Sequence, residues 1–202
     1  MRPPPTDTTG AINIIKENTM KPFTSTHIIN GVTLTLLQGN IVEVEADALV
    51  NAANRALAGG GGVDGAIHDA GGPSIMEECR KIGGCATGSA VATRAGRLKA
   101  QYIFHAVGPI YYGQGNEAAL LTSTYQTCLA LAEQYQLKSI AFPSISTGAY
   151  GYPLDEAAPI ALSTIINHIK QPTSLQQVMF VLLGRYAYTA YEDALKRLLT
   201  AA

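Results

Sequence analysis

Neither a long apolar run nor an excess of charge of one sign occurs in this sequence. No apolar stretch approaches the roughly 20 residues needed to cross a bilayer, and residues 1–5 are too polar to open a secretory signal peptide. The 14 Lys and Arg residues nearly balance the 15 Asp and Glu residues, which leaves a formal charge of −1. We therefore expect a soluble protein whose overall charge gives no footprint for nucleic acid or for a membrane.

Cysteine is also scarce. The three cysteines, Cys79, Cys85 and Cys128, have neither the number nor the spacing typical of disulfide pairs or of a metal site. Reduced thiols in the cytoplasm are the simplest interpretation, and we expect buried thiols rather than nucleophiles because none has an obvious activating partner. The histidines suggest no metal site either, and His105, inside an apolar run, is expected to be a hydrogen-bonded core residue.

The length and the apolar composition of the chain predict one folded domain. A chain of 202 residues with 47% apolar composition is long enough to bury one sizeable core. Residues 1–25 mix Pro, Thr, Gly and isolated charges without a sustained period, which is typical of a flexible N-terminal extension. Residues 26–202 are then the folded domain.

Strand and helix patterns alternate through this domain. Asn30-Gly31 between two β-branched runs predicts a hairpin. Further short apolar runs predict buried strands at 48–50, 102–107, 139–145 and 178–183. Apolar residues repeat at three- and four-residue steps at 63–70, 121–132, 158–169 and 187–198, which predicts helices there. Residues 74–82 also have a helical pattern. The order predicts an α/β protein, a three-layer α/β/α sandwich with a mixed central sheet, whose ligands bind beyond the carboxyl ends of the strands.

A glycine-rich loop, residues 51–65, follows one predicted strand and leads into a helix. Its four consecutive glycines, Gly59 to Gly62, cost backbone entropy, which a chain tolerates where its backbone must approach a ligand closely. Amides at a helix N-terminus present donors and partial positive charge, so a phosphate is the expected ligand. A flexible linker is the alternative, but linkers rarely lie between a buried strand and an amphipathic helix.

The same loop contains a literal G-x-G-x-x-G at Gly60, Gly62 and Gly65, which raises the alternative of a nicotinamide-dependent oxidoreductase. That fingerprint requires a tight turn directly after the strand and an acidic residue about 20 positions further on at the end of a second strand. Here residues 74–82 have a helical pattern instead. No Gly-Lys-Ser or Gly-Lys-Thr closes the loop, so nucleoside triphosphate hydrolysis is not expected either.

A second loop, residues 144–153, follows the predicted strand at 139–145 and offers hydroxyls, backbone amides and the aromatic ring of Tyr150. Two loops of this kind can hold a pyrophosphate from opposite sides with neutral donors, which requires no basic cluster. Tyr150 would then cover a sugar.

These two loops, together with Gln38-Gly39-Asn40-Ile41, resemble the macrodomain family. The runs 50–54 and 59–68 look like the MacroD-type branch in particular, and the similarity continues through 85–88, 104–109 and 141–148. The resemblance covers roughly residues 32–200 in order and leaves out only the N-terminal extension.

The resemblance implies an ADP-ribose cleft at the strand ends and an ADP-ribosyl hydrolase that needs no cofactor. For this branch it implies removal of mono-ADP-ribose from acidic side chains of proteins, with deacetylation of O-acetyl-ADP-ribose as a related activity. ADP-ribosylated nucleic acid stays open as a further substrate. A module that binds ADP-ribose without cleaving it, and a phosphatase acting on ADP-ribose phosphate, are the main alternatives.

Carried over by position, the resemblance assigns roles to individual residues. Asp64, in the first turn of its helix, would orient or activate water together with Asn54, and whether Asp64 or a substrate phosphate takes the proton stays open. Asn51 and Asn54 would line the ribose pocket. His68 lies four residues after Asp64 and so contacts the same region or has a packing role. The remaining ligand-binding set is Asn40, Ile41, Ala52, Gly60, Gly61, Gly62, Val63, Ser146, Thr147, Gly148, Ala149, Tyr150 and Tyr186.

One position departs from the family pattern. The signature has aspartate after Gly39, where it accepts a hydrogen bond from the adenine amino group, but this chain has Asn40. Because charge-assisted hydrogen bonds are about twice as strong as neutral ones, we expect adenine binding to weaken by about 1 kcal/mol. Tyr186 follows the last predicted strand and either flanks adenine or packs on the surface.

Overall fold

A computed structural model describes residues 22–200, which form seven strands, five α-helices and a short 3-10 helix. In chain order these are β1 (Thr24–Ile29), β2 (Val32–Gln38), η1 (Ile41–Glu43), β3 (Ala48–Ala52), α1 (Gly62–Gly71), α2 (Pro73–Ile82), β4 (Ser89–Arg94), β5 (Tyr102–Val107), α3 (Glu117–Gln134), β6 (Ser139–Phe142), α4 (Leu154–Ile169), β7 (Gln177–Leu182) and α5 (Arg185–Thr200). None of the described helices is long and apolar enough to span a membrane.

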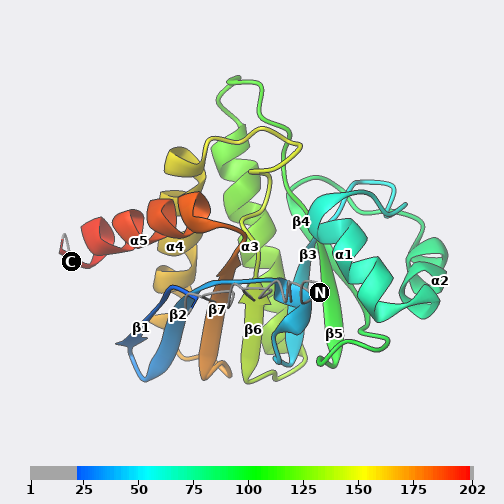
Figure 1. Ribbon diagram of the computed structural model, residues 1–202, viewed down its shortest axis with the longest axis horizontal. Helices are drawn as coiled ribbons and strands as arrows, with labels where there is room; N and C mark the ends of the chain where they lie inside the picture. Colours follow the sequence, from blue (N-terminus) through cyan, green and yellow to red (C-terminus); the bar gives the residue numbers. More distant parts are fainter. Residues whose placement is uncertain (1–21, 201–202) are drawn as a thin grey trace, which may run out of the picture.

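The strands form one sheet in the order β1-β2-β7-β6-β3-β5-β4 (Figure 1). The five central strands are parallel, and β1 and β4 pair antiparallel at the two edges. The predicted mixed sheet is therefore confirmed. Of the predicted N-terminal extension, residues 1–21 lie outside the described part of the chain, whereas Thr24 and Ser25 already belong to β1.

Each side of the sheet has its own apolar core, which makes the protein the predicted three-layer α/β/α sandwich. Successive residues of a strand face opposite sides, so Phe104 belongs to the apolar cluster that contains residues of α3, α4 and α5. Its neighbour Ile103 belongs to the cluster that contains residues of α1 and α2. The same alternation separates Phe180 from Met179. Burial on both faces explains why the central strands appear in the sequence as short continuous apolar runs.

The opening hairpin forms where the Asn-Gly pair predicts it. Ile29 pairs with Val32, and the two turn residues have positive φ, 49° at Asn30 and 82° at Gly31. Two positive φ values in succession are required by a type I′ turn, which Asn-Gly adopts readily. The predicted strand at 139–145 is shorter than expected, because the chain leaves the sheet after Phe142.

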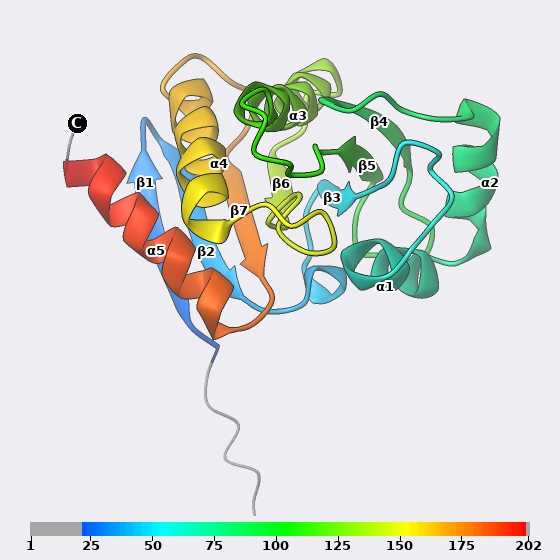
Figure 2. The same cartoon turned by 90° about the horizontal axis from the view of Figure 1, so that it is seen from above.

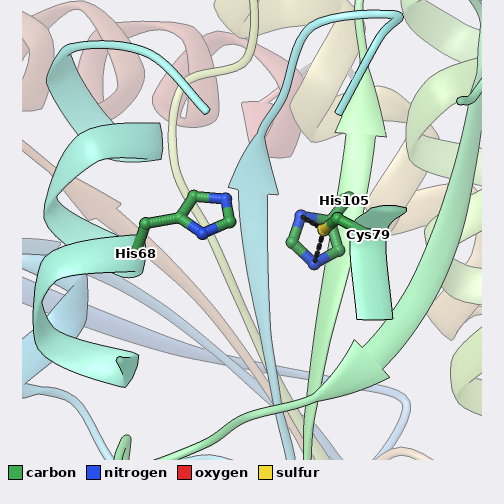
Figure 3. Close-up of side chains that lie close together, drawn as sticks. All are labelled: His68, Cys79 and His105. Atoms are coloured by element: carbon green, nitrogen blue, oxygen red, sulfur yellow. Dashed lines mark hydrogen bonds between the residues drawn. The ribbon is translucent and has the colours of Figure 1, made fainter. Parts of the chain in front are cut away.

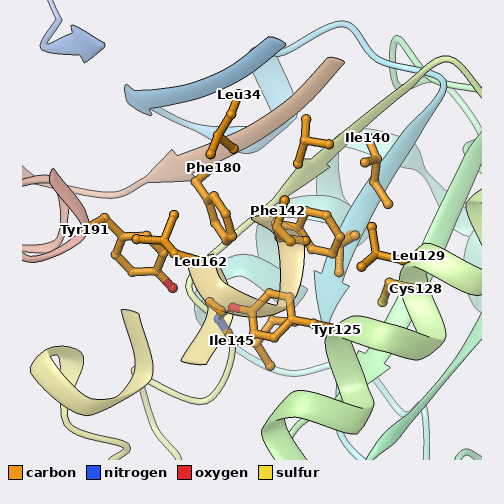
Figure 4. Packing of buried hydrophobic residues seen from close by; sticks show 14 of the residues in the cluster. Leu34, Tyr125, Cys128, Leu129, Ile140, Phe142, Ile145, Leu162, Phe180 and Tyr191 are labelled. Carbon is orange, nitrogen blue, oxygen red and sulfur yellow. Dashed lines mark hydrogen bonds between the residues drawn. The ribbon is translucent and has the colours of Figure 1, made fainter. Parts of the chain in front are cut away.

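Two buried tyrosines connect the apolar core to the loop that follows β6. The Tyr125 hydroxyl on α3 accepts a hydrogen bond of 3.2 Å from the Ile145 amide. The Tyr191 hydroxyl on α5 donates to Ser144 Oγ at 2.9 Å. Figure 4 shows both rings packed around Phe142 and Phe180. The loop after β6 is thus fixed from beneath by the core.

Replacing Tyr125 with Phe should lower the free energy of unfolding by about 1–2 kcal/mol, because the buried Ile145 amide loses its acceptor. Urea titration followed by circular dichroism measures this difference. Tyr135→Phe is the matched control, since its ring stacks on Tyr102 and its hydroxyl makes no hydrogen bond within residues 22–200. Equal stability of the two variants would contradict the bracing role of Tyr125.

Candidate functional site

The glycine-rich loop leads from the end of β3 directly to the N-terminus of α1. Gly59 and Gly62 have φ values of 78° and 61°, which other residues adopt only with strain. Gly61 caps the helix without any side-chain hydrogen bond, so the first amides of α1 have no side-chain acceptor. This geometry suits an anion at the N-terminus of α1, as the sequence predicts.

The second loop reaches the same place from β6. Its backbone is tightly folded, with hydrogen bonds from the Tyr152 amide to the Ser146 carbonyl at 3.0 Å and from the Gly151 amide to the Gly148 carbonyl at 2.9 Å. Ser146 has a φ of 67°, an uncommon value for a residue with a side chain. A Cβ atom at Gly108, just beyond β5, would collide with Ser146 Oγ, so glycine there permits the close approach of the two strand ends.

The two loops lie at the carboxyl ends of β3 and β6 (Figure 2). A pocket of about 440 Å³ lies between them. Ligands of open α/β sheets bind at this position. No lysine, arginine or histidine is among the lining residues that the structure describes, so the pocket offers backbone amides and dipoles rather than formal positive charge. The lining residues are Ala52, Ala53, Asn54, Gly60, Gly61, Gly62, Val63, Asp64, Ala106, Gly108, Ser144, Ile145, Ser146, Gly148, Ala149 and Tyr150.

The structure thus brings together most of the predicted site residues but places six of them off the pocket wall. Ile41 is buried in the core beneath η1, and Thr147 turns its hydroxyl to the Ser144 carbonyl. Tyr186, at the start of α5, is 77% exposed. Asn40 is exposed, and its Oδ1 accepts from the Val42 amide at 3.3 Å. The other two, Asn51 and His68, lie behind Asp64.

Asp64 is 4% exposed, and its two carboxylate oxygens have different surroundings. Oδ1 accepts a hydrogen bond of 2.6 Å from Asn51 Nδ2 and lies 3.4 Å from His68 Nε2. Oδ2 has no hydrogen-bond partner among residues 22–200 and would lie 3.2 Å from a Cβ atom at Gly60. Because Gly60 lines the pocket, Oδ2 is the oxygen left free for a ligand or a water molecule there.

Asn54 shapes the loop as well as lining the pocket. Its Nδ2 donates to the Gly59 carbonyl at 2.8 Å, and its Oδ1 accepts from the Ala58 amide at 3.2 Å. One amide hydrogen of Nδ2 is left after these bonds. Nδ2 lies 3.9 Å, and Asp64 Oδ2 lies 3.2 Å, from the position that a Cβ atom at Gly60 would occupy. The sequence predicts the pair Asn54 and Asp64 but not the structural role of Asn54.

His68, Cys79 and His105 approach one another behind the pocket, a grouping that the sequence analysis missed (Figure 3). Their ligand atoms lie close enough to hold one metal ion. Both nitrogens of His105 are already engaged, Nδ1 with Asn51 Nδ2 at 3.1 Å and Nε2 with Thr93 Oγ1 at 2.9 Å. Burial raises the pKa of Cys79 to about 11, which keeps a protonated thiol. The grouping therefore fits a hydrogen-bonded cluster, and the expectation of a hydrogen-bonded core residue at His105 is confirmed.

The other two thiols have no hydrogen bond to a basic side chain. Cys128 is buried, and burial raises the pKa of its thiol. Cys85 is half-buried, rather than buried as expected, and its pKa is also raised by burial. Thiols of this kind are poor nucleophiles at neutral pH.

A third loop, between β5 and α3, contacts the second loop. The carboxylate of Glu117 is 4% exposed and accepts from the amides of Tyr112, Gln114 and Gly115 at 3.1, 2.9 and 2.7 Å. The Tyr111 amide of this loop donates to the Tyr150 carbonyl at 2.9 Å. Glu117 therefore fixes the loop that holds Tyr150 in place.

Comparison with known proteins gives the class of this fold and site. The family model for the Macro domain matches residues 50–161. A Macro domain-containing protein of Caldanaerobacter subterraneus subsp. tengcongensis is 54% identical over 170 residues, 82% of this chain and 97% of that protein. O-acetyl-ADP-ribose deacetylase 1 of Pantoea vagans is 48% identical over 78% of this chain and 95% of its own length.

The solved structure of an Oceanobacillus iheyensis macrodomain with ADP has a TM-score of 0.88 to this chain. It is 38% identical, and the alignment covers 91% of this chain and 100% of that one. The α/β/α sandwich with its strand-end pocket is therefore a macrodomain fold. The chain belongs to the Macro domain family, which confirms the resemblance seen in its loops.

Glu117 should make the stability of the protein depend on pH. Backbone hydrogen bonds, that of Gln114 above all, lower its pKa from 4.5 to about 2. A depressed carboxyl pKa contributes stability that is complete above the ordinary value and is lost as the pH falls towards the folded value. Wild type should thus exceed Glu117→Gln in stability at pH 7, and the difference should shrink between about pH 4.5 and 2.

Urea unfolding of both proteins at a series of pH values measures that difference. Glu77→Gln removes the same charge from an exposed position of α2 and serves as the control, with a difference that stays near zero throughout. A constant gap between wild type and Glu117→Gln across this range would contradict the assignment.

Proposed function

We propose that the pocket binds ADP-ribose and that the protein hydrolyses esters at its distal ribose. O-acetyl-ADP-ribose and mono-ADP-ribose attached to acidic side chains of proteins are the proposed substrates. One observation carries the proposal: a buried carboxylate oxygen, Asp64 Oδ2, has no protein partner within residues 22–200 and lies against the pocket wall at the N-terminus of α1. The related protein named O-acetyl-ADP-ribose deacetylase supports the same chemistry.

The diphosphate would lie between the two loops. The amides of Gly60 to Val63 face it from the start of α1, where the helix dipole favours an anion. The segment from Ser146 to Tyr150 faces it from the other side, with Tyr150 on the distal ribose. Neutral donors suffice for such a cradle, and the solved macrodomain with ADP supports a ligand that contains a diphosphate.

Hydrolysis needs a placed water molecule, an acceptor for its proton and a clamped ribose. Asp64 Oδ2 would accept a hydrogen bond from the water, and the remaining Asn54 amide hydrogen would donate to the water oxygen. For an ester at the anomeric carbon of the distal ribose, the water oxygen bonds to that carbon as its bond to the ester oxygen breaks. The carboxylate departs with the electrons of the broken bond, and the water proton passes to Asp64 or to a phosphate oxygen of the substrate. For O-acetyl-ADP-ribose the products are acetate and ADP-ribose.

The alternative functions require different groups in this pocket or release different products. A module that only binds ADP-ribose has no need of a buried free carboxylate beside the ribose position. A phosphatase acting on ADP-ribose phosphate would release inorganic phosphate, which product analysis detects. The oxidoreductase alternative lacks its fingerprint, since α1 leads into α2 rather than into a second strand with an acidic residue at its end.

Asp64→Ala should lower the rate of O-acetyl-ADP-ribose hydrolysis by about 10²- to 10⁴-fold, the range for loss of a general base, while ADP-ribose still binds. Release of acetate measures the rate, and calorimetry measures binding. Asn54→Ala should show a smaller loss of rate together with weaker binding, because the side chain also closes the loop.

Asp69→Asn is the matched control for Asp64, because it removes a carboxylate from an exposed position of the same helix. Its turnover should equal that of wild type. Near wild-type turnover by Asp64→Ala with intact binding would remove Asp64 from the mechanism. The same assay on a glutamate-linked ADP-ribosyl protein tests the second proposed substrate.

Asn40→Asp should bind ADP-ribose about fivefold more tightly than wild type, a difference of about 1 kcal/mol. Either side chain can accept from the Val42 amide, but only the carboxylate adds a charged acceptor for the adenine amino group. Titration calorimetry at fixed salt compares the two proteins. Equal or weaker binding by the variant would show that Asn40 does not recognise adenine.

A further inference from the structure

A chain of buried polar side chains, outside the pocket, supports the back of Asp64. Asn51, at 0% exposed, donates from Nδ2 to Asp64 Oδ1 at 2.6 Å. The same Nδ2 lies 3.1 Å from His105 Nδ1, and His105 Nε2 lies 2.9 Å from Thr93 Oγ1. Thr93 and His105 are equally buried. The chemistry proposed above uses only the Asp64 end of this chain.

The direction of the hydrogen bonds in the chain follows from its first member. The Asp64 carboxylate can only accept, so Asn51 Nδ2 donates to it, and the same Nδ2 faces His105 Nδ1 at 3.1 Å. Nδ1 is therefore an acceptor, and the ring proton is on Nε2, which donates to Thr93 Oγ1 at 2.9 Å. Burial lowers the pKa of His105 to about 4, which agrees with a neutral ring.

The acceptor at His105 Nδ1 and the carboxylate oxygen Asp64 Oδ1 together fix the orientation of the Asn51 amide. The two hydrogens of Nδ2 serve two acceptors, His105 Nδ1 and Asp64 Oδ1. A flipped amide would turn its oxygen towards both of these acceptors, which is repulsive. The observed orientation leaves Asn51 Oδ1 buried without a partner in the described part of the chain, a cost that buried polar groups rarely bear without a compensating role.

We propose that His105 is a positioning residue for the ester hydrolysis described above. Through Asn51 it holds Asp64 Oδ1 at the back of the pocket, so that Oδ2 stays turned towards the water. His68 also lies near Oδ1, but at 3.4 Å and with a partly exposed side chain, and Cys79 Sγ lies 3.6 Å from His105 Nε2. Neither group supplies the acceptor that orients Asn51. This inference rests on the proposed function.

Two substitutions of His105 distinguish the role of the acceptor at Nδ1 from the role of the donor at Nε2. An asparagine side chain places its carbonyl oxygen near the position of Nδ1, and a glutamine side chain places its amide nitrogen near the position of Nε2. His105→Asn should keep the rate of O-acetyl-ADP-ribose hydrolysis within about threefold of wild type. His105→Gln should lose about tenfold or more in kcat with little change in ADP-ribose affinity.

A purely structural role of His105 predicts a different result. The two variants would then have equally low kcat values, or His105→Gln would have the higher kcat, and either result would overturn the proposal. Thr93→Val leaves the ring in place but removes the acceptor at Nε2, and it should lower kcat about threefold with unchanged affinity. His168→Gln, on the remote face of α4 beside Glu133, is the control and should retain wild-type turnover.

The tautomer of His105 gives a measurement that does not depend on activity. Nitrogen NMR of histidine-labelled protein at pH 7 should show a protonated Nε2 and a bare Nδ1 in wild type. A proton on Nδ1 would overturn the positioning proposal even in an active enzyme. A wild-type protein with the expected tautomer that binds ADP-ribose but releases no acetate would instead overturn the proposed function.

Discussion

The hydrogen bond from Asn51 to Asp64 connects the two elements on which the site depends. Asn51 belongs to β3 and Asp64 to the first turn of α1, so this 2.6 Å contact joins sheet and helix across the glycine-rich loop. It fixes the position of the helix N-terminus relative to the strand ends. Without that constraint, a loop with so many glycines has many conformations, and ordering its amides around one ligand would cost conformational entropy.

The pocket that we propose for ADP-ribose has no formal positive charge among its described lining residues. Its wall offers backbone amides, the start of a helix and hydroxyl groups, and its one acidic side chain, Asp64, has a carboxylate oxygen without a partner among residues 22–200. Backbone donors cost nothing in side-chain entropy when they are held by a rigid sheet. The conformational cost appears instead at Ser146, whose φ of 67° is an uncommon value for a residue with a side chain. Strain of this kind persists where the surrounding core holds it, as Tyr125 and Tyr191 do beneath the second loop.

Much of the fold could be predicted from the sequence because its signals are local. The buried strands appear as apolar runs, the helices as periodic ones, and the hairpin as Asn-Gly. The strand β4 was missed, because its Ala, Ser and Thr residues have weak apolar alternation and it forms by pairing with β5 at the edge of the sheet. The loop between β5 and α3 was missed as well, since Glu117 organises it through backbone contacts that leave no sequence pattern.

The sequence by itself determined the α/β alternation and the two glycine-bearing loops, since each depends on residues close together in the chain. The candidate pair Asn54 and Asp64 came from the resemblance of these loops to the macrodomain family. Only the tertiary structure decided that Asn51 faces the interior rather than the pocket, and that His105 and Thr93 lie behind it. Strand pairing sets which side chains from distant segments meet and in which direction their hydrogen bonds run, and a linear pattern contains no information about either.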